Sequence, residues 1–282
     1  ARFPARFEGP PGAANGGIIV GALACPALAA ASSEGVAHAG VTRISARLHA
    51  SAPLEQPLRV DVAEARGAYR VSILDGDRPL VSGSVEVAYG DHAPSIGDAL
   101  SPIPGGRAND IQQLARVPVP DRPPFFEETG DHPIPGCFSC GPEHAGGMRI
   151  FPRVAGEGIV CAPWRPAHEF DDSGGALAAL ILTSALDCSS GICMPVEMQR
   201  ELLDLDQFFL LGSLDVRYLR VASVERDYRV AAKALLRDGR KFFGLSALFD
   251  DAGVPYALAE ATWIVAGMTR IKAFGASTEQ DR

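Results

Sequence analysis

Two stretches of this sequence carry almost no polar side chains along the length of a helix. The first is "GGIIVGALACPALAAAS", residues 16–32, which follows directly on Asn15. The second is "ALILTSALDCSSGIC", residues 179–193, which contains one charged residue, Asp187. A helix that is apolar on every side must be enclosed on every side. A long antiparallel sheet that curls around one helix provides that enclosure, so the sequence predicts two units of this kind.

Alternating strands follow each apolar stretch, which supports a duplicated unit. In the first half, the strand patterns and a hairpin cover residues 41–49, 58–65 and 69–89. The second half opens with an extra strand pair at residues 146–154 and 158–164, and a helix at roughly 173–191 follows. Three longer strand patterns come after this helix, at residues 211–221, 227–253 and 254–267. When Cys25 is placed on Cys188, the elements follow the same order in both halves.

The repeat divides the chain into a first unit at residues 1–90 and a second unit at residues 137–275, with a tail at 276–282. Residues 91–136 hold nine of the 22 prolines and no convincing periodic segment. A structureless stretch of this length is uncommon inside a compact domain. We interpret it as a linker that straps the two units together or as a loop that covers a site.

The composition narrows the classes of partner. The 282 residues include 26 basic and 34 acidic side chains, a net charge of −8, and no cluster of Lys and Arg, so a nucleic-acid partner is not expected. No apolar run reaches about 18 residues without interruption, so no membrane span is expected. The six cysteines are scattered along the chain, which is typical of reduced thiols in a cytoplasmic protein.

Three segments of the chain resemble one known family. "FEGPPGAANGG" at residues 7–17 is similar to the Gly-Pro-Pro-Gly-x-x-Asn-Gly-Gly segment of acyl-CoA thioesterases. "GCFSCGPEHAGGMRIFPRV" at 136–154 and "SALDCSSG" at 184–191 resemble segments of thioesterase-like hotdog proteins. The resemblance covers most of the chain outside the linker. It implies an α+β double hotdog fold, in which two units each wrap a long antiparallel sheet around a central apolar helix.

The sequence departs from the family pattern in each half. In the small thioesterases, a Gly-Gly turn precedes a carboxylate on the following helix. Here the first turn ends at Gly17, and the residue seven positions later is Ala24. The matching position of the second helix is Asp187, but the Gly-Gly pair of that half, residues 174–175, lies too early. Each half therefore keeps a different part of the motif.

Because hotdog sites of the family lie between two units, the split motif predicts one composite site. The backbone N–H groups of Gly16 and Gly17 would polarise a thioester carbonyl as negative charge develops on it. Asp187 would act as base or nucleophile, because burial raises the pKa and basicity of a carboxylate. Asn15 would cap the helix or orient substrate, and Thr183, one turn before Asp187, would position water or the carboxylate. The mirror-related site has no carboxylate and would be inactive.

Plainer interpretations stay open for these residues. Asp187 also fits a structural role near the helix C-terminus, with a hydrogen bond to a hydroxyl such as that of Ser190. The Asn-Gly-Gly turn also fits a simple helix cap. His168 precedes the second helix and is a candidate substrate contact, although lone histidines at such positions are usually surface residues. A cavity lined by Gly16 or Gly17 beside the Asp187 carboxylate would favour the catalytic interpretation.

The cysteines are not expected to bind a metal. The segment from Cys137 to Cys140 resembles half of a zinc knuckle, but the second closely spaced pair that would complete four ligands is absent. Cys188 has no histidine near it in the sequence and matches Cys25, which favours a packing role. We therefore expect no metal and no cofactor.

These observations favour a hydrolase that acts on an acyl-CoA or another acyl thioester in a groove between the two helices. The alternative is a non-catalytic hotdog protein that binds acyl thioesters or lipids, which the split motif supports equally. A dehydratase is a weaker third alternative, because no histidine lies in either apolar helix. Candidates for binding CoA phosphates are the strand residues Arg43, Arg47, Arg217 and Arg220. The acyl chain, its carrier and the formation of a homo-oligomer stay open.

Overall fold

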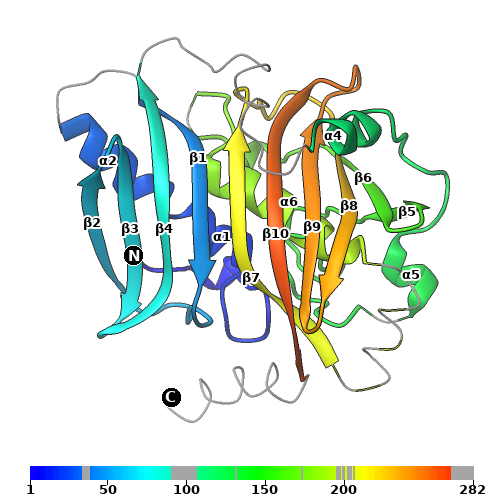
Figure 1. Ribbon diagram of the computed structural model, residues 1–282, viewed down its shortest axis with the longest axis horizontal. Helices are drawn as coiled ribbons and strands as arrows, with labels where there is room; N and C mark the ends of the chain where they lie inside the picture. The colour runs from blue at the N-terminus through cyan, green and yellow to red at the C-terminus, as the bar shows by residue number, and fades with distance from the viewer. Residues whose placement is uncertain are drawn as a thin grey trace.

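The computed structural model describes residues 1–33, 39–89, 107–130, 132–172, 174–194 and 207–267, together with residues 198, 201 and 205. One antiparallel sheet crosses this part of the chain, with strand order β2-β3-β4-β1-β7-β10-β9-β8-β6-β5 (Figure 1). The strands are β1 (Ala39–Leu48), β2 (Arg59–Ala65), β3 (Ala68–Asp75), β4 (Arg78–Tyr89), β5 (Arg153–Gly156), β6 (Ile159–Trp164), β7 (Gln207–Tyr218), β8 (Tyr228–Asp238), β9 (Lys241–Phe249) and β10 (Pro255–Gly267). The helices are α1 (Gly16–Gly21), α2 (Ala24–Ser33), α4 (Ala108–Ala115), α5 (Phe125–Thr129) and α6 (Ala179–Ile192), with short 3-10 turns at Ala5–Phe7 and His168–Phe170.

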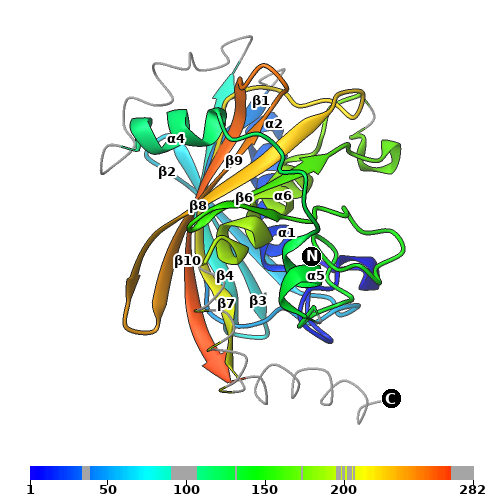
Figure 2. The same ribbon diagram turned by 90° about the vertical axis from the view of Figure 1, so that its right-hand side faces the viewer.

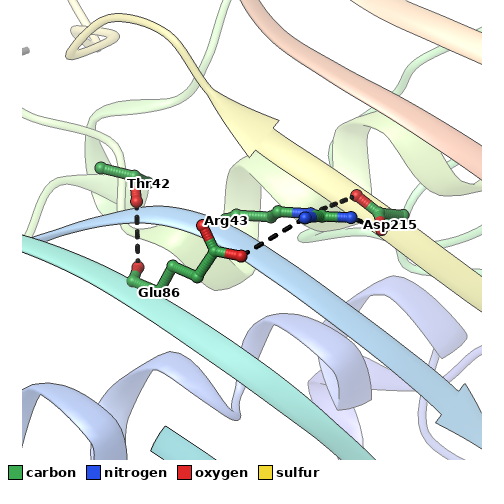
Figure 3. Close-up of polar contacts among 4 residues, drawn as sticks. All are labelled: Thr42, Arg43, Glu86 and Asp215. Carbon is green, nitrogen blue, oxygen red and sulfur yellow. Dashed lines mark hydrogen bonds and ion pairs between the residues drawn. The ribbon is translucent and has the colours of Figure 1, made fainter. Parts of the chain in front are cut away.

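The sheet is continuous because the two halves of the chain meet edge to edge. Strand β1 of the first half pairs with β7 of the second, with Arg43 opposite Arg217. The Arg43 side chain also joins the halves, since its guanidinium donates to both carboxylate oxygens of Asp215 at 3.0 and 2.7 Å and to Glu86 at 3.3 Å (Figure 3). The predicted α+β architecture of two joined units is confirmed.

The apolar helices lie together on one face of the sheet. Figure 2 shows α1, α2 and α6 on this face and α4 on the other. Helix α6 packs on β8, β9 and β10, and α2 packs mainly on β1 and β4. Most residues of α6 are buried, including both polar and apolar side chains along its middle. The enclosure that an all-round apolar helix requires is therefore provided by the sheet and by the partner helix.

The first apolar stretch is divided into two helices, whereas α6 is unbroken. Helix α1 ends at Gly21, and α2 begins at Ala24 after a two-residue turn. Pro26 lies in the first turn of α2, where its missing N–H and fixed φ are tolerated. Inside a single continuous helix the same proline would remove a backbone hydrogen bond, so the break falls just before it.

Two glycines let α1 approach α6 closely. A Cβ atom at Gly17 would lie 2.6 Å from the Cα of Ser184, and one at Gly21 would lie 2.4 Å from the Cα of Leu180. Residues four apart share one helix face, so both glycines face α6. The offset that places Cys25 on Cys188 also carries Gly17 to Leu180 and Gly21 to Ser184. The two contacts are therefore related by the internal repeat, and the helices cross at its pseudo-two-fold axis.

Residues Gly16–Ser33 together form an 18-residue helical stretch with a mean hydropathy of 1.6, which is long and apolar enough to cross a membrane. This stretch corrects the expectation that no apolar run reaches about 18 residues. Half of the stretch is buried inside the protein against α6 and the sheet. This placement is what a core helix requires, so the stretch is weak evidence for a membrane span.

Several element boundaries differ from the prediction. The second apolar helix begins at Ala179 and not near residue 173, because Gly174 and Gly175 form a turn bonded to Asp171. In the extra strand pair, the first strand begins only at Arg153. Helices α4 and α5 lie within the stretch expected to lack periodic elements. Residues 91–106 and 131 of that stretch, and the predicted tail, lie outside the described residues.

Candidate active site

Asn15 fixes the start of α1 and ties it to α6. The backbone N–H of Ile18 donates to Asn15 Oδ1 at 3.1 Å, which is the hydrogen bond of a helix N-cap. The Ser184 hydroxyl of α6 donates to the same oxygen at 3.0 Å. The Asn15 side chain is buried, with 2% of its surface exposed. Its capping role and its contact with α6 therefore hold the two helices in one register.

Asp187 reaches from α6 to the first turn of α1. Its Oδ2 accepts a hydrogen bond of 2.8 Å from the backbone N–H of Gly17. Its Oδ1 is buried and has no hydrogen-bond partner within the described part of the chain. The close approach depends on glycine, since a Cβ at position 17 would lie 2.8 Å from the Asp187 Cβ. One carboxylate oxygen is thus anchored to the other helix, and the second is unpaired.

Burial raises the pKa of the Asp187 carboxyl from 3.8 to about 7, because the charged form is removed from water. The Gly17 N–H opposes this shift by stabilising the carboxylate. A carboxyl with a pKa near neutrality exchanges its proton readily at physiological pH, which is the property of a general base or acid.

A cavity of about 350 Å³ opens beside Asp187. Elements of both halves of the chain line it, including the start of α1, the middle of α6 and the strands β7 and β10 at the junction of the halves. Its apolar wall includes Ile19, Ile192, Phe208, Phe209, Leu211, Trp263 and Ile264. Three exposed basic side chains also line it, His49, Arg78 and Arg240, and their exposure places them where the cavity meets solvent.

The two glycines of the predicted oxyanion pair are not equivalent. The Gly17 N–H is taken up by Asp187, so in this arrangement it positions the carboxylate and does not face a substrate. Gly16 lines the cavity, and its N–H has no acceptor among the described residues. The predicted donor role therefore fits Gly16 alone.

Two other predicted site residues do not line the cavity. Thr183 is fully buried, and its hydroxyl bonds the Ala179 carbonyl at 2.7 Å and the Tyr218 hydroxyl. Its hydroxyl therefore braces α6 against β7 and makes no hydrogen bond to the Asp187 side chain. His168 lies on the surface, with its Nδ1 3.5 Å from a carboxylate oxygen of Glu225. Proximity in sequence to the second helix did not bring His168 to the site.

The arginines suggested for CoA phosphates also lie away from the cavity lining. Arg43 is engaged by two carboxylates at the junction of the halves (Figure 3). Arg220 donates to the carbonyl of Pro255 at 2.7 Å. The arginines that line the cavity are Arg78 and Arg240, and the alternating pattern of the strands did not distinguish them from other exposed arginines.

The structure adds the 132–140 segment to the site. The backbone N–H of Phe138 donates to the Glu8 carbonyl at 2.7 Å, and the Ser139 hydroxyl donates to the Ser184 carbonyl at 2.8 Å. These contacts bring Cys137 and Cys140 to the cavity wall beside Asp187 and Cys188. All three motifs of the sequence resemblance therefore meet at one place, which their positions along the chain did not reveal.

His132 also lines the cavity. Its Nδ1 accepts a hydrogen bond from the Ile134 N–H at 3.0 Å, so the neutral ring carries its proton on Nε2. Burial lowers the pKa of His132 to about 4, which keeps the ring neutral at physiological pH. In this state Nε2 can donate a hydrogen bond but cannot accept a proton.

Comparison with solved structures identifies the fold. The chain superimposes on the TesB protein of Mycobacterium avium subspecies paratuberculosis with a TM-score of 0.56 and 15% identity, over 94% of this chain and 90% of that one. An acyl-CoA thioesterase II, TesB2, of Mycobacterium marinum gives 0.57 and 14%, over 89% and 90%. The dehydratase domain of RzxB from Pseudomonas fluorescens gives 0.51 and 15%, over 93% and 92%.

The matches cover nearly the whole of both chains, so this protein has the double hotdog fold that the sequence resemblance implied. No protein-family model matches the sequence, and no curated protein sequence matches it either. At identities of 14 to 15%, the likeness establishes the fold and leaves the reaction to the chemistry of the site.

Proposed function

We propose that this double hotdog protein hydrolyses an acyl thioester at one composite site between its two halves. The observation that carries the proposal is the Asp187 carboxylate. One of its oxygens accepts from the Gly17 N–H, the other is buried without a hydrogen-bond partner among the described residues, and the residue itself lines the cavity. A buried carboxylate oxygen without a partner is costly for stability, which points to a partner supplied by substrate or water.

The reaction follows from this placement. Asp187 takes a proton from a water molecule as the water oxygen attacks the thioester carbonyl carbon. The N–H of Gly16 stabilises the negative charge that develops on the carbonyl oxygen. The carbon–sulfur bond then breaks, and the departing thiolate takes the proton that Asp187 holds. The products are a carboxylic acid and a free thiol, and the Asp187 side chain returns to its carboxylate form.

The shape and charge of the cavity support an acyl-CoA as the substrate class. The wall of Phe208, Phe209 and Trp263 suits an apolar acyl group, because burial of apolar surface is favourable. Arg78 and Arg240 at the solvent end of the cavity suit the phosphates of CoA. The structural neighbour from Mycobacterium marinum is named as an acyl-CoA thioesterase II, which agrees with this assignment.

The competing functions are less well supported by the geometry. In hotdog dehydratases a histidine is paired with an acid, and here His132 and Asp187 do share a cavity. The hydrogen bond from Ile134 to Nδ1 leaves His132 with a protonated Nε2, which cannot remove a proton from a substrate. A binding protein without catalysis would need no unpaired carboxylate oxygen at its cavity wall.

The test is the release of free thiol from a panel of short, long and aromatic acyl-CoAs. Asp187→Asn keeps the size of the side chain and an oxygen for the Gly17 N–H, but it removes the base. We expect turnover by the wild-type protein and a loss of about 100-fold or more in kcat for the variant. Equal turnover by both proteins would contradict the role of Asp187. Binding of acyl-CoA without any thiol release would instead establish a binding protein.

A further inference from the structure

Three cysteine sulfurs converge at the wall of the cavity. The Sγ atoms of Cys137, Cys140 and Cys188 all lie within 4.8 Å of one another. The Sγ atoms of Cys137 and Cys188 are 3.7 Å apart, and all three cysteines are free thiols. A tetrahedral zinc ion with Zn–S bonds of about 2.3 Å separates its sulfur ligands by about 3.8 Å. The distance between the Cys137 and Cys188 sulfurs therefore matches one edge of a tetrahedral thiolate site, and the Cys140 sulfur lies within 4.8 Å of both.

The Cys137–Gly141 turn has the backbone of a metal-binding knuckle. The backbone N–H groups of Ser139 and Cys140 point to the Cys137 sulfur, and hydrogen bonds from the Cys140 and Cys188 thiols act with them to lower its pKa. The Gly141 N–H donates to the Cys137 carbonyl at 2.8 Å and closes the turn. N–H groups that point at a sulfur stabilise the thiolate form, which is the form that binds a metal.

Glycine is required at the end of this turn. A Cβ at Gly141 would lie 2.3 Å from the Pro135 carbonyl oxygen and 2.4 Å from the Cys137 nitrogen. The tight turn sends both cysteine side chains to the same side, where α6 contributes Cys188. Two chain segments about 50 residues apart thus supply one set of sulfur atoms.

A second layer of contacts holds the cluster. The Asn15 amide nitrogen lies 3.7 Å from the Cys137 sulfur and 3.9 Å from the Cys188 sulfur. Its orientation is fixed, because the amide oxygen is occupied by the Ile18 N–H and the Ser184 hydroxyl. Hydrogen bonds of this kind orient the ligands of protein metal sites.

A carboxylate oxygen of the residue next to Cys188 has no hydrogen-bond partner among the described residues. Asp187, next to Cys188 in the sequence, is 2% exposed, and its Oδ1 is unpaired within the described residues. Asp187 and the three cysteines line the same cavity. A site with three protein ligands and a fourth position open to a cavity is typical of metals that bind water or substrate.

The cluster does not follow from the internal repeat or from ordinary packing. Cys25, the counterpart of Cys188 in the first half, is exposed and has no second cysteine beside it in the described structure. Cys161 and Cys193 are buried singly, and burial raises the pKa of the Cys161 thiol to about 11. The buried cysteines outside the cluster therefore behave as small apolar residues.

We propose that Cys137, Cys140 and Cys188 bind a thiophilic divalent metal ion of the zinc class, with a fourth coordination position open to the cavity. The sequence alone predicted no metal, because it showed a single Cys-x-x-Cys pair and assigned Cys188 to packing. The proposal does not depend on thioester hydrolysis, since metal binding is measured whether or not the protein is an enzyme.

The deciding experiment uses the full-length wild-type protein, purified with a reducing agent, stripped with a chelator and then incubated with zinc. Metal content is measured after gel filtration, and the thiols are titrated with a colorimetric thiol reagent with and without zinc. We expect one zinc ion per chain and three thiols that zinc protects and a chelator exposes again. Absence of retained zinc in fully reduced protein would overturn the proposal.

Three serine substitutions locate the site. Cys140→Ser and Cys188→Ser should lower zinc affinity about tenfold or more, whereas the matched control Cys25→Ser should bind as the wild type does. Cobalt-loaded wild-type protein should show a sulfur-to-cobalt charge-transfer band that Cys188→Ser weakens. Equal zinc binding by all four proteins would place the metal elsewhere and contradict the assignment. The wild-type experiment decides the proposal even where a variant fails to fold.

Discussion

The two halves of this molecule share one architecture but differ at the point where their helices meet. Helix α1 begins with a side-chain cap from Asn15 and has glycine at position 17. Helix α6 has Ala178 at its N-cap position, which forms no side-chain cap, and Leu180 in the place that matches Gly17. In the other direction, α6 carries Asp187 where the first stretch carries Ala24.

Under the proposed function, the difference explains how a duplicated fold gives a single site. The capped turn with glycine comes from one half, and the carboxylate comes from the other, so their meeting produces one complete constellation. The mirror-related position combines Leu180 with Ala24 and has no polar group of either kind. Duplication thus relaxed the requirement that each half keep the whole motif.

The largest expected effect is the pH dependence of stability. It comes from the buried carboxyl of Asp187 on α6, because Ala24 at the matching position of the first half cannot ionise. In chelator-treated, metal-free protein, the folded state holds the Asp187 proton up to a pH of about 7, while the unfolded chain releases it near its ordinary pKa of 3.8. The free energy of unfolding should therefore fall as pH rises between these values, by roughly 1.4 kcal/mol per pH unit from this group.

Urea unfolding at a series of pH values measures this effect. The matched control is Asp187→Asn, which cannot titrate, so its stability should approach and then exceed that of the wild type as the pH rises. Parallel stability curves for the two proteins would show that Asp187 has the same pKa in both states.

A somewhat smaller effect is expected from the contact between the helices. Gly17→Ala places a Cβ 2.6 Å from the Ser184 Cα, so α1 must move away from α6. We expect a loss of about 1–3 kcal/mol in the free energy of unfolding, together with a loss of thiol release. Gly40→Ala is the control, because no atom lies within 4 Å of its Cβ position. Equal stability of the two variants would show that α1 and α6 are less closely packed than described.

The smallest effect concerns the solvent end of the cavity. Arg78→Gln should raise KM for acyl-CoA a few-fold with little change in kcat or stability, because the side chain is exposed and lies away from Asp187. The increase should shrink at high salt, since exposed charges are screened. Arg70→Gln, on a neighbouring strand but outside the cavity lining, is the control. An equal change in both variants would point to net charge and not to a local phosphate contact.

Much of the fold was predictable because it depends on local patterns. The two apolar stretches required enclosure, and the alternating strands provided it. The match of Cys25 with Cys188 placed Ala24 opposite Asp187 and so predicted the unequal halves. Helix α4 was missed because prolines surround it, although Ile111 and Leu114, the two residues it buries, have helical spacing.

The site was only partly predictable, since it depends on which segments meet in space. Asp187 was identified because it is the one charged residue in an apolar stretch. Gly17 was identified because it belongs to the Asn-Gly-Gly turn that opens the other stretch. Cys137 and Cys140 were seen as a pair, but their meeting with Cys188 depends on the turn docking against α6. Thr183 was misplaced because helical spacing alone does not tell whether a side chain faces the cavity or β7.

The most direct test of the unequal halves is the stoichiometry of ligand binding. A calorimetric titration of the wild-type protein with a non-hydrolysable thioether analogue of the best acyl-CoA substrate would count the competent sites. We predict one molecule bound per chain, at the composite site of Asp187 and α1. Two molecules per chain would show that the half with Ala24 also forms a working site, and the claim of a single composite site would fail.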